Sequence, residues 1–118
     1  MKTVKITVDN KVSIIDIDLD DFRSIQEEIG GYAETVSTRR TYNYFDAPVV
    51  MLVDEEGILK NLPINILGSW LYACEEYGDP IVGDIILAIR DFEYLKGFSE
   101  PEKIVQKLFN DFHWLELA

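Results

Sequence analysis

The chain has 118 residues, with 22 acidic residues against 11 basic ones and a formal net charge of −11. This length suits a single compact domain that buries about two-thirds of its unfolded surface, and the negative charge disfavours direct binding to nucleic acid or to anionic membranes, because both rest on Lys and Arg. A single cysteine, Cys74, excludes an internal disulfide, and no apolar run approaches the ~20 residues of a membrane span, so we expect a cytoplasmic protein.

The first twenty residues predict a β-hairpin, because apolar and polar side chains alternate along two segments, residues 2–8 and 12–20. A two-residue turn at Asn10-Lys11 would set Ile6 opposite Ile15. The same register would set Lys5 opposite Asp16, so that opposite charges share one face and apolar residues share the other.

A short helix and a third strand should follow the hairpin. Asp20 or Asp21 can cap this helix, and Gly30-Gly31 can end it. Residues 32–38 are rich in β-branched side chains, which favours a strand. Residues 39–47 are polar and aromatic without a clear period, so we expect an exposed loop or an extended hairpin arm there.

The second half of the chain predicts two more strands around a helix. Residues 49–53 form a continuous apolar run, typical of a strand covered on both faces. A tight turn should follow, with a positive φ at Gly57. Asn65 is placed to cap a helix over residues 66–77, whose apolar face carries Ile66, Leu67, Trp70, Leu71 and Cys74. Residues 81–90 predict the next strand.

The chain should end with a helix. Ser99 and Glu102 have the spacing of a capping box, and an apolar stripe follows them. The order of elements therefore predicts an α+β fold, with about five mostly antiparallel strands and three helices in a single compact domain.

Four segments carry a resemblance to a known family: Ile29-Gly30-Gly31-Tyr32, Ala47 to Gly57, Leu62-Pro63-Ile64-Asn65 and Ile81-Val82-Gly83-Asp84. In this order and spacing they resemble the DUF3846 family of small phage, mobile-element and bacterial proteins of unknown function. The likeness covers roughly residues 2–112. It implies an intracellular, phage or mobile-element setting and supplies no catalytic residues. The chain departs from the usual family pattern at residues 39–46 and 66–77.

No catalytic or metal-binding pattern stands out. His113 is the single histidine, which excludes a histidine-rich metal site, and Asp54-Glu55-Glu56 lacks the spaced ligands of a calcium loop. We therefore expect no metal and no cofactor, and a protein that is not an enzyme. A small enzyme that uses Asp84 as an acid or base is the weakest of the alternatives.

Asn65 and Asp84 are the first candidate site residues. Asp84 interrupts an apolar strand candidate, and a buried carboxylate must be paired, hydrogen-bonded or at a rim. Asn65 can be a helix cap and Asp84 a strand-end residue that bonds to backbone. The functional alternative is that both converge with Gly83 as polar groups in a small ligand pocket.

The second candidate site mixes cationic and aromatic side chains at Arg39, Arg40, Tyr42 and Tyr44. Arg and aromatic residues are favoured in binding hot spots, and they can also stack a base and clamp a phosphate. The alternative is a mobile loop without a binding role.

These observations favour a non-enzymatic binding protein, an accessory or anti-defence factor of a phage or mobile element, that binds a host protein or sequesters a small ligand. An alternative is an acidic DNA mimic that inhibits a DNA-binding protein, motivated by the net charge and by the row Asp16, Asp18, Asp20. A homodimer through the 66–77 helix or the 39–46 segment is also plausible, because the chain has many aromatic residues.

Overall fold

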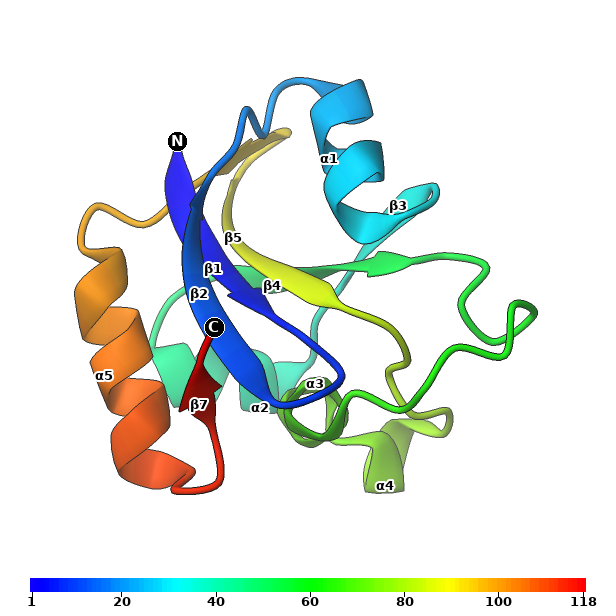
Figure 1. Cartoon of the computed structure of the whole chain (residues 1–118). Helices are drawn as coiled ribbons and strands as arrows, with labels where there is room; N and C mark the ends of the chain where they lie inside the picture. The colour runs from blue at the N-terminus through cyan, green and yellow to red at the C-terminus, as the bar shows by residue number, and fades with distance from the viewer.

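The chain folds into one twisted sheet with helices on both of its faces (Figure 1). The structure is a computed structural model that describes residues 1–118. The strands are β1 (Lys2–Ile6), β2 (Lys11–Asp16), β3 (Ala33–Val36), β4 (Val49–Asp54), β5 (Ile85–Asp91), β6 (Tyr94–Lys96) and β7 (Glu116–Leu117). The helices are α1 (Phe22–Ile29), α2 (Arg39–Phe45), α3 (Ile66–Tyr72), α4 (Cys74–Tyr77) and α5 (Pro101–Asp111).

The expected α+β domain with a mostly antiparallel sheet is confirmed, but the predicted counts are wrong. There are seven strands and five helices instead of about five and three. The additional strands, β6 and β7, have three residues and two residues, too short for an alternating pattern to reveal. None of the helices has the length and apolarity that a bilayer crossing requires.

The strand order is β3-β4-β5-β1-β2-β7. The start of β5 pairs with β1, and the end of β5 pairs with β6. All neighbours are antiparallel except β2 and β7, which are parallel. The third strand along this path, β5, therefore joins the pair β3-β4 to the hairpin β1-β2.

The predicted register of the first hairpin is wrong. Ile6 pairs with Val12 and Lys5 with Ser13, because a four-residue turn over residues 7–10 replaces the predicted two-residue turn. This three-residue shift moves Ile15 to the opposite face of the sheet from Ile6. Lys5 instead forms an ion pair with Glu28 of α1, with 2.9 Å between Nζ and Oε1.

The sheet has an apolar core on each face, as the continuous apolar run of β4 predicted. Val49, Met51 and Val53 belong to the larger core cluster, and the alternate residues Val50 and Leu52 belong to the smaller one. All six residues of β4 are buried. The central strands are therefore covered on both sides, which is typical of such apolar runs.

The two faces are covered unequally. Side chains of α2, α3 and α5 pack on the larger core cluster, with Leu67, Leu71 and Leu108 fully buried. The other face has α1 alone, which contributes Ile25 and Ile29 (Figure 1). Asp21 caps α1 and Gly30 ends it in the left-handed conformation, both as expected.

The expectation of a loop or hairpin arm at residues 39–47 is wrong, because Arg39–Phe45 forms α2. Tertiary contacts explain this helix. Thr41 is fully buried, and its hydroxyl donates to the Leu71 carbonyl oxygen at 2.9 Å while accepting from the Thr38 backbone N–H at 3.1 Å. Tyr44 and Phe45 of α2 pack on the core without an apolar helical period, whereas Tyr42 is exposed.

Other local expectations also need correction. The helix predicted over residues 66–77 is divided into α3 and α4 by Ala73, which has a left-handed φ of 58°. The last helix begins after Glu100 with Pro101 in its first turn, without the predicted Ser99 capping box. Gly57 does not have a positive φ, and its importance is spatial, because an added Cβ would lie 2.7 Å from Val82 Cγ2.

Candidate functional site

Asn65 joins three parts of the fold. Its Oδ1 accepts from the Gly68 backbone N–H at 2.9 Å, which makes it the cap of α3 as predicted. Its Nδ2 donates to the carbonyl oxygens of Ile6 at 3.1 Å and Gly83 at 3.0 Å. The side chain is fully buried, so its two amide protons are used inside the protein. Asn65 and Gly83 therefore lie together, as the pocket hypothesis expected, but they are joined by a direct hydrogen bond between them.

Asp84 lies just before β5, at a rim of the sheet, and not within a strand. Its Oδ1 accepts from the Val8 backbone N–H at 3.0 Å, and its Oδ2 lies 3.9 Å from Lys5 Nζ. About a third of the side chain is exposed. This strand-end position with a backbone partner is the structural alternative that the sequence left open.

Other residues of the family-like segments make similar structural contacts. Asp54 is nearly buried, and its Oδ2 lies 2.7 Å from Lys60 Nζ while its Oδ1 accepts from the Glu56 backbone N–H. A Cβ on Gly31 would lie 2.7 Å from Asp54 Oδ2, so a larger residue there would have to displace the Asp54–Lys60 ion pair. The segments that carry the resemblance therefore contact each other. These contacts hold the connection between β4 and β5, which contains α3 and α4.

A separate surface hollow brings together three of the predicted binding residues. It has a volume of about 430 Å³ and lies between α2, α3 and α4. We call it the Arg–aromatic hollow, and its lining residues are Arg39, Arg40, Asn43, Tyr44, Trp70, Glu76 and Tyr77. Tyr42, the fourth predicted residue of this group, is exposed but does not line the hollow.

Arg40 is fixed in the Arg–aromatic hollow by three contacts. Its Nη1 donates to the Trp70 carbonyl oxygen at 3.1 Å, its Nη2 forms an ion pair with Glu75, and Cζ lies 5.1 Å from the centre of the Trp70 ring. The pKa of Glu75 is lowered by a hydrogen bond with its own backbone and then by Arg40. Arg39 has no ion pair and is exposed, so its charge is available to a partner.

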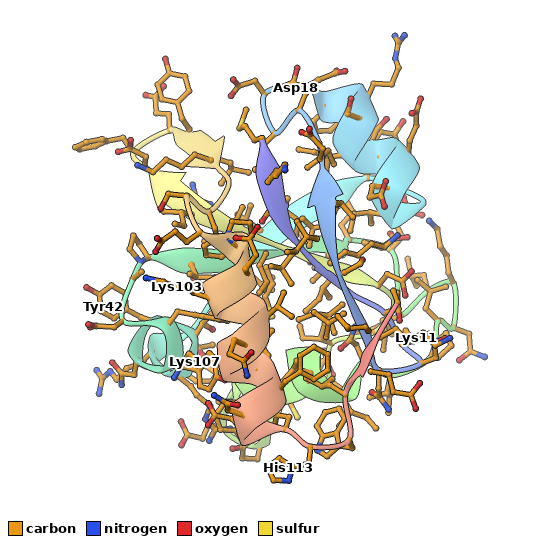
Figure 2. The ribbon with its side chains drawn as sticks, turned by 60° about the vertical axis from the view of Figure 1, so that its left-hand side comes forward. Lys11, Asp18, Tyr42, Lys103, Lys107 and His113 are labelled. Atoms are coloured by element: carbon orange, nitrogen blue, oxygen red, sulfur yellow. The ribbon has the colours of Figure 1, made fainter.

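Tyr44 forms the inner wall of the hollow. Its ring lies edge-on to Trp70, with 5.6 Å between ring centres, and Lys107 Nζ of α5 lies 4.4 Å from the centre of the Tyr44 ring. Its hydroxyl donates to Asp111 Oδ2 at 2.7 Å. Burial, followed by this hydrogen bond, raises the Tyr44 pKa well above its ordinary value. Figure 2 shows Lys107 on α5 beside the helix that carries Tyr42.

The sequence did not identify Trp70 and Tyr77 as parts of this site. The apolar helical pattern predicted Trp70 on the core face of its helix, yet 41% of Trp70 and 53% of Tyr77 is exposed. The left-handed turn at Ala73 redirects the chain between them. The excess of aromatic residues in 66–77 was the signal that could have indicated a surface role.

Comparison of the sequence with protein-family models identifies the family of this chain. The family model described as "Domain of unknown function (DUF3846)" matches residues 1–113. The chain belongs to the DUF3846 family. This match covers nearly the whole DUF3846 fold described above, including the Arg–aromatic hollow. Neither the comparison with curated proteins nor the comparison with solved structures gives a match.

The DUF3846 chain groups no three histidine, cysteine or carboxylate side chains in a way that could hold a metal ion. What the Arg–aromatic hollow offers is a fixed guanidinium, a free one and exposed ring surface. These groups can make charge-assisted hydrogen bonds and stacking contacts with a partner.

Proposed function

We propose that this DUF3846 protein is a non-enzymatic binding protein, an accessory or anti-defence factor of a phage or mobile element, which contacts a host protein through the Arg–aromatic hollow. The observation that supports this proposal most is the composition of the hollow. Arg, Trp and Tyr dominate binding hot spots, and this hollow contains two arginines, a tryptophan and two tyrosines.

The shape of the Arg–aromatic hollow favours a protein over a small ligand. A small-molecule site usually encloses most of its ligand and is lined mainly by apolar side chains. This hollow is open, and three of its seven lining residues are hydrophobic. An open polar surface with fixed aromatic edges suits an inserted side chain or loop of a protein partner.

Pre-organisation also supports binding here. Arg40 is already held by Trp70 and Glu75, so a partner does not need to immobilise it. Arg39 is free to supply a charge for an acidic group of the partner.

Affinity capture from host lysate with matched variants tests the proposal. Arg39→Ala should reduce capture of the same host protein about tenfold or more, because loss of a hot-spot residue costs at least about 1–2 kcal/mol. Arg23→Ala removes another exposed arginine, in α1, and should change nothing. Equal capture by wild type and Arg39→Ala would show that the host protein does not bind through the Arg–aromatic hollow. A small-molecule mass retained in native mass spectrometry of freshly purified protein would instead support sequestration of a ligand.

A second candidate, the acidic DNA mimic, is favoured by the exposure of Asp16, Asp18 and Asp20. These carboxylates alternate with the buried Ile17 and Leu19, so they point outward together. Replacement of all three by Asn should abolish binding to a DNA-binding partner if mimicry is the function. Unchanged partner binding by this variant would exclude it.

A further inference from the structure

A second hollow lies on the sheet face that α1 covers alone. It also has a volume of about 430 Å³, and seven of its ten lining residues are hydrophobic. We call it the α1 groove, and its lining residues are Leu19, Asp20, Phe22, Ile25, Ala33, Thr35, Leu52, Glu93, Tyr94 and Leu95. The segment entering α1 and α1 itself form one wall, the β5–β6 hairpin forms the other, and β3 and β4 form the floor.

The two faces of the sheet carry different numbers of helices. The opposite face is covered by α2, α3 and α5, whereas this one has only α1, whose eight residues span about 12 Å. Pairing places Thr35 opposite Leu52 and Leu95 opposite Arg90, so these side chains share the α1 side of the sheet. The floor next to α1 therefore combines Leu52, which is 2% exposed, with the hydrogen-bonded side chains of Thr35 and Arg90.

Exposed aromatic residues border the α1 groove. Phe22 is 59% exposed on one wall and Tyr94 is 68% exposed on the other. Phe92, at the turn of the β5–β6 hairpin, is 91% exposed and has a left-handed φ of 56°, a conformation that a bulky residue rarely adopts. Folding alone does not require a phenylalanine there.

The negative charge around the groove favours a basic partner. The segments that form the walls, residues 16–23 and 91–96, contain six carboxylates and two cations. Asp20 and Glu93 line the groove from opposite walls, and Figure 2 shows Asp18 beside α1, at the end of the molecule opposite His113. Arg90 is the cation that reaches the floor, where its Nη2 donates to Thr35 Oγ1 at 2.7 Å. A second copy of this acidic chain would be repelled, whereas a basic partner would be attracted.

We infer that the α1 groove is a docking site for an amphipathic helix of a partner protein, with an apolar stripe flanked by Lys and Arg. The stripe lies on Leu95 and on the rings of Phe22 and Tyr94, and the basic flanks meet Asp20 and Glu93. This site is separate from the Arg–aromatic hollow, so it stands or falls independently of the proposed function.

The test uses a synthetic helical peptide of Leu and Lys, about four turns long, with Leu at helical i, i+3, i+4 and i+7 spacing. A peptide with the same composition in scrambled order is the matched control. Fluorescence anisotropy should show at least about tenfold tighter binding of the amphipathic peptide, weakening at high salt. Amide shift changes in NMR spectra should concentrate on the lining residues of the α1 groove.

Two protein variants complete the test. Glu93→Lys and Tyr94→Ala change exposed side chains of the groove wall, so the fold should persist, and each should weaken peptide binding about tenfold. Asp79→Lys makes the same change of charge as Glu93→Lys at an exposed site outside the groove and should leave binding within about twofold. Equal binding of both peptides, shift changes elsewhere, or equal effects of the two lysine variants would overturn the inference.

Discussion

Replacement of Asn65 by Ala should be among the most destabilising single changes in this protein. The substitution removes the cap of α3, worth about 1 kcal/mol, and two donated hydrogen bonds. It leaves the buried carbonyl oxygens of Ile6 and Gly83 without this partner, at a cost of about 1–2 kcal/mol each. The expected loss is about 3–5 kcal/mol, a large part of the ~6–18 kcal/mol typical for a chain of this length.

Urea unfolding followed by circular dichroism measures this loss. Asn65→Ser keeps a capping oxygen but loses the amide protons, so it should recover only about 1 kcal/mol relative to Asn65→Ala. Asn43→Ala, at an exposed position of α2, is the control and should change the free energy of unfolding by less than about 0.5 kcal/mol. A loss below about 1 kcal/mol for Asn65→Ala, or a Ser variant no more stable than the Ala variant, would refute the reasoning.

Four further changes test other parts of the fold. Gly57→Ala should destabilise by about 1–3 kcal/mol because its Cβ would overlap Val82, and Val82→Ala in the same chain should recover part of that loss in thermal unfolding. Thr41→Val removes the 2.9 Å donor to the Leu71 carbonyl oxygen, which keeps only the Thr38 hydroxyl at 3.4 Å, and it leaves the Thr38 backbone N–H without its acceptor. It should lower the free energy of unfolding by about 1–3 kcal/mol in urea. Phe92→Asn relieves a left-handed φ and should raise the unfolding free energy by about 0.5–1 kcal/mol; a loss would contradict the strain. Because the folded state raises the Tyr44 pKa, stability should fall as pH rises above the ordinary tyrosine value near 10, and Tyr44→Phe should remove the last ionising step seen by ultraviolet absorbance.

Local sequence signals predicted the parts of the fold that depend on a few neighbouring residues. The apolar run 49–53 became a strand buried on both faces, and Asp21, Gly30 and Asn65 became helix ends. Each of these signals reflects a local requirement, either burial of apolar side chains or hydrogen-bond partners for free backbone groups at a helix end. That is why they could be recognised without knowing the fold.

The first hairpin shows where such local reasoning fails. Pairing Lys5 with Asp16 satisfied both charges within the hairpin, so the predicted register was self-consistent. In the folded chain Lys5 pairs with Glu28 and Asp16 pairs with the terminal amine, at 2.9 Å and 3.0 Å. Because Lys5 and Asp16 each have a distant partner, the hairpin does not need to place them opposite each other. The strands can therefore pair in another register, with a longer turn at residues 7–10.

The candidate sites depended on distant contacts to different degrees. Arg39, Arg40 and Tyr44 were predicted as a group because they are close in sequence. Trp70 and Tyr77 join them only through the packing of α2 against α3 and the break at Ala73. The α1 groove was not predicted, because its walls come from segments about seventy residues apart in the printed sequence.

The position of β5 has a consequence for how the chain is made. During synthesis, the hairpin β1-β2 and the pair β3-β4 both leave the ribosome before β5, which must then enter between them. Until that happens, β1 and β4 each present an unpaired apolar edge, the kind of surface that chaperones and aggregation compete for. The short strand β7 covers the outer edge of β2 only after α5 has also been made. The nascent chain is therefore most vulnerable between the emergence of β4 and the emergence of β5.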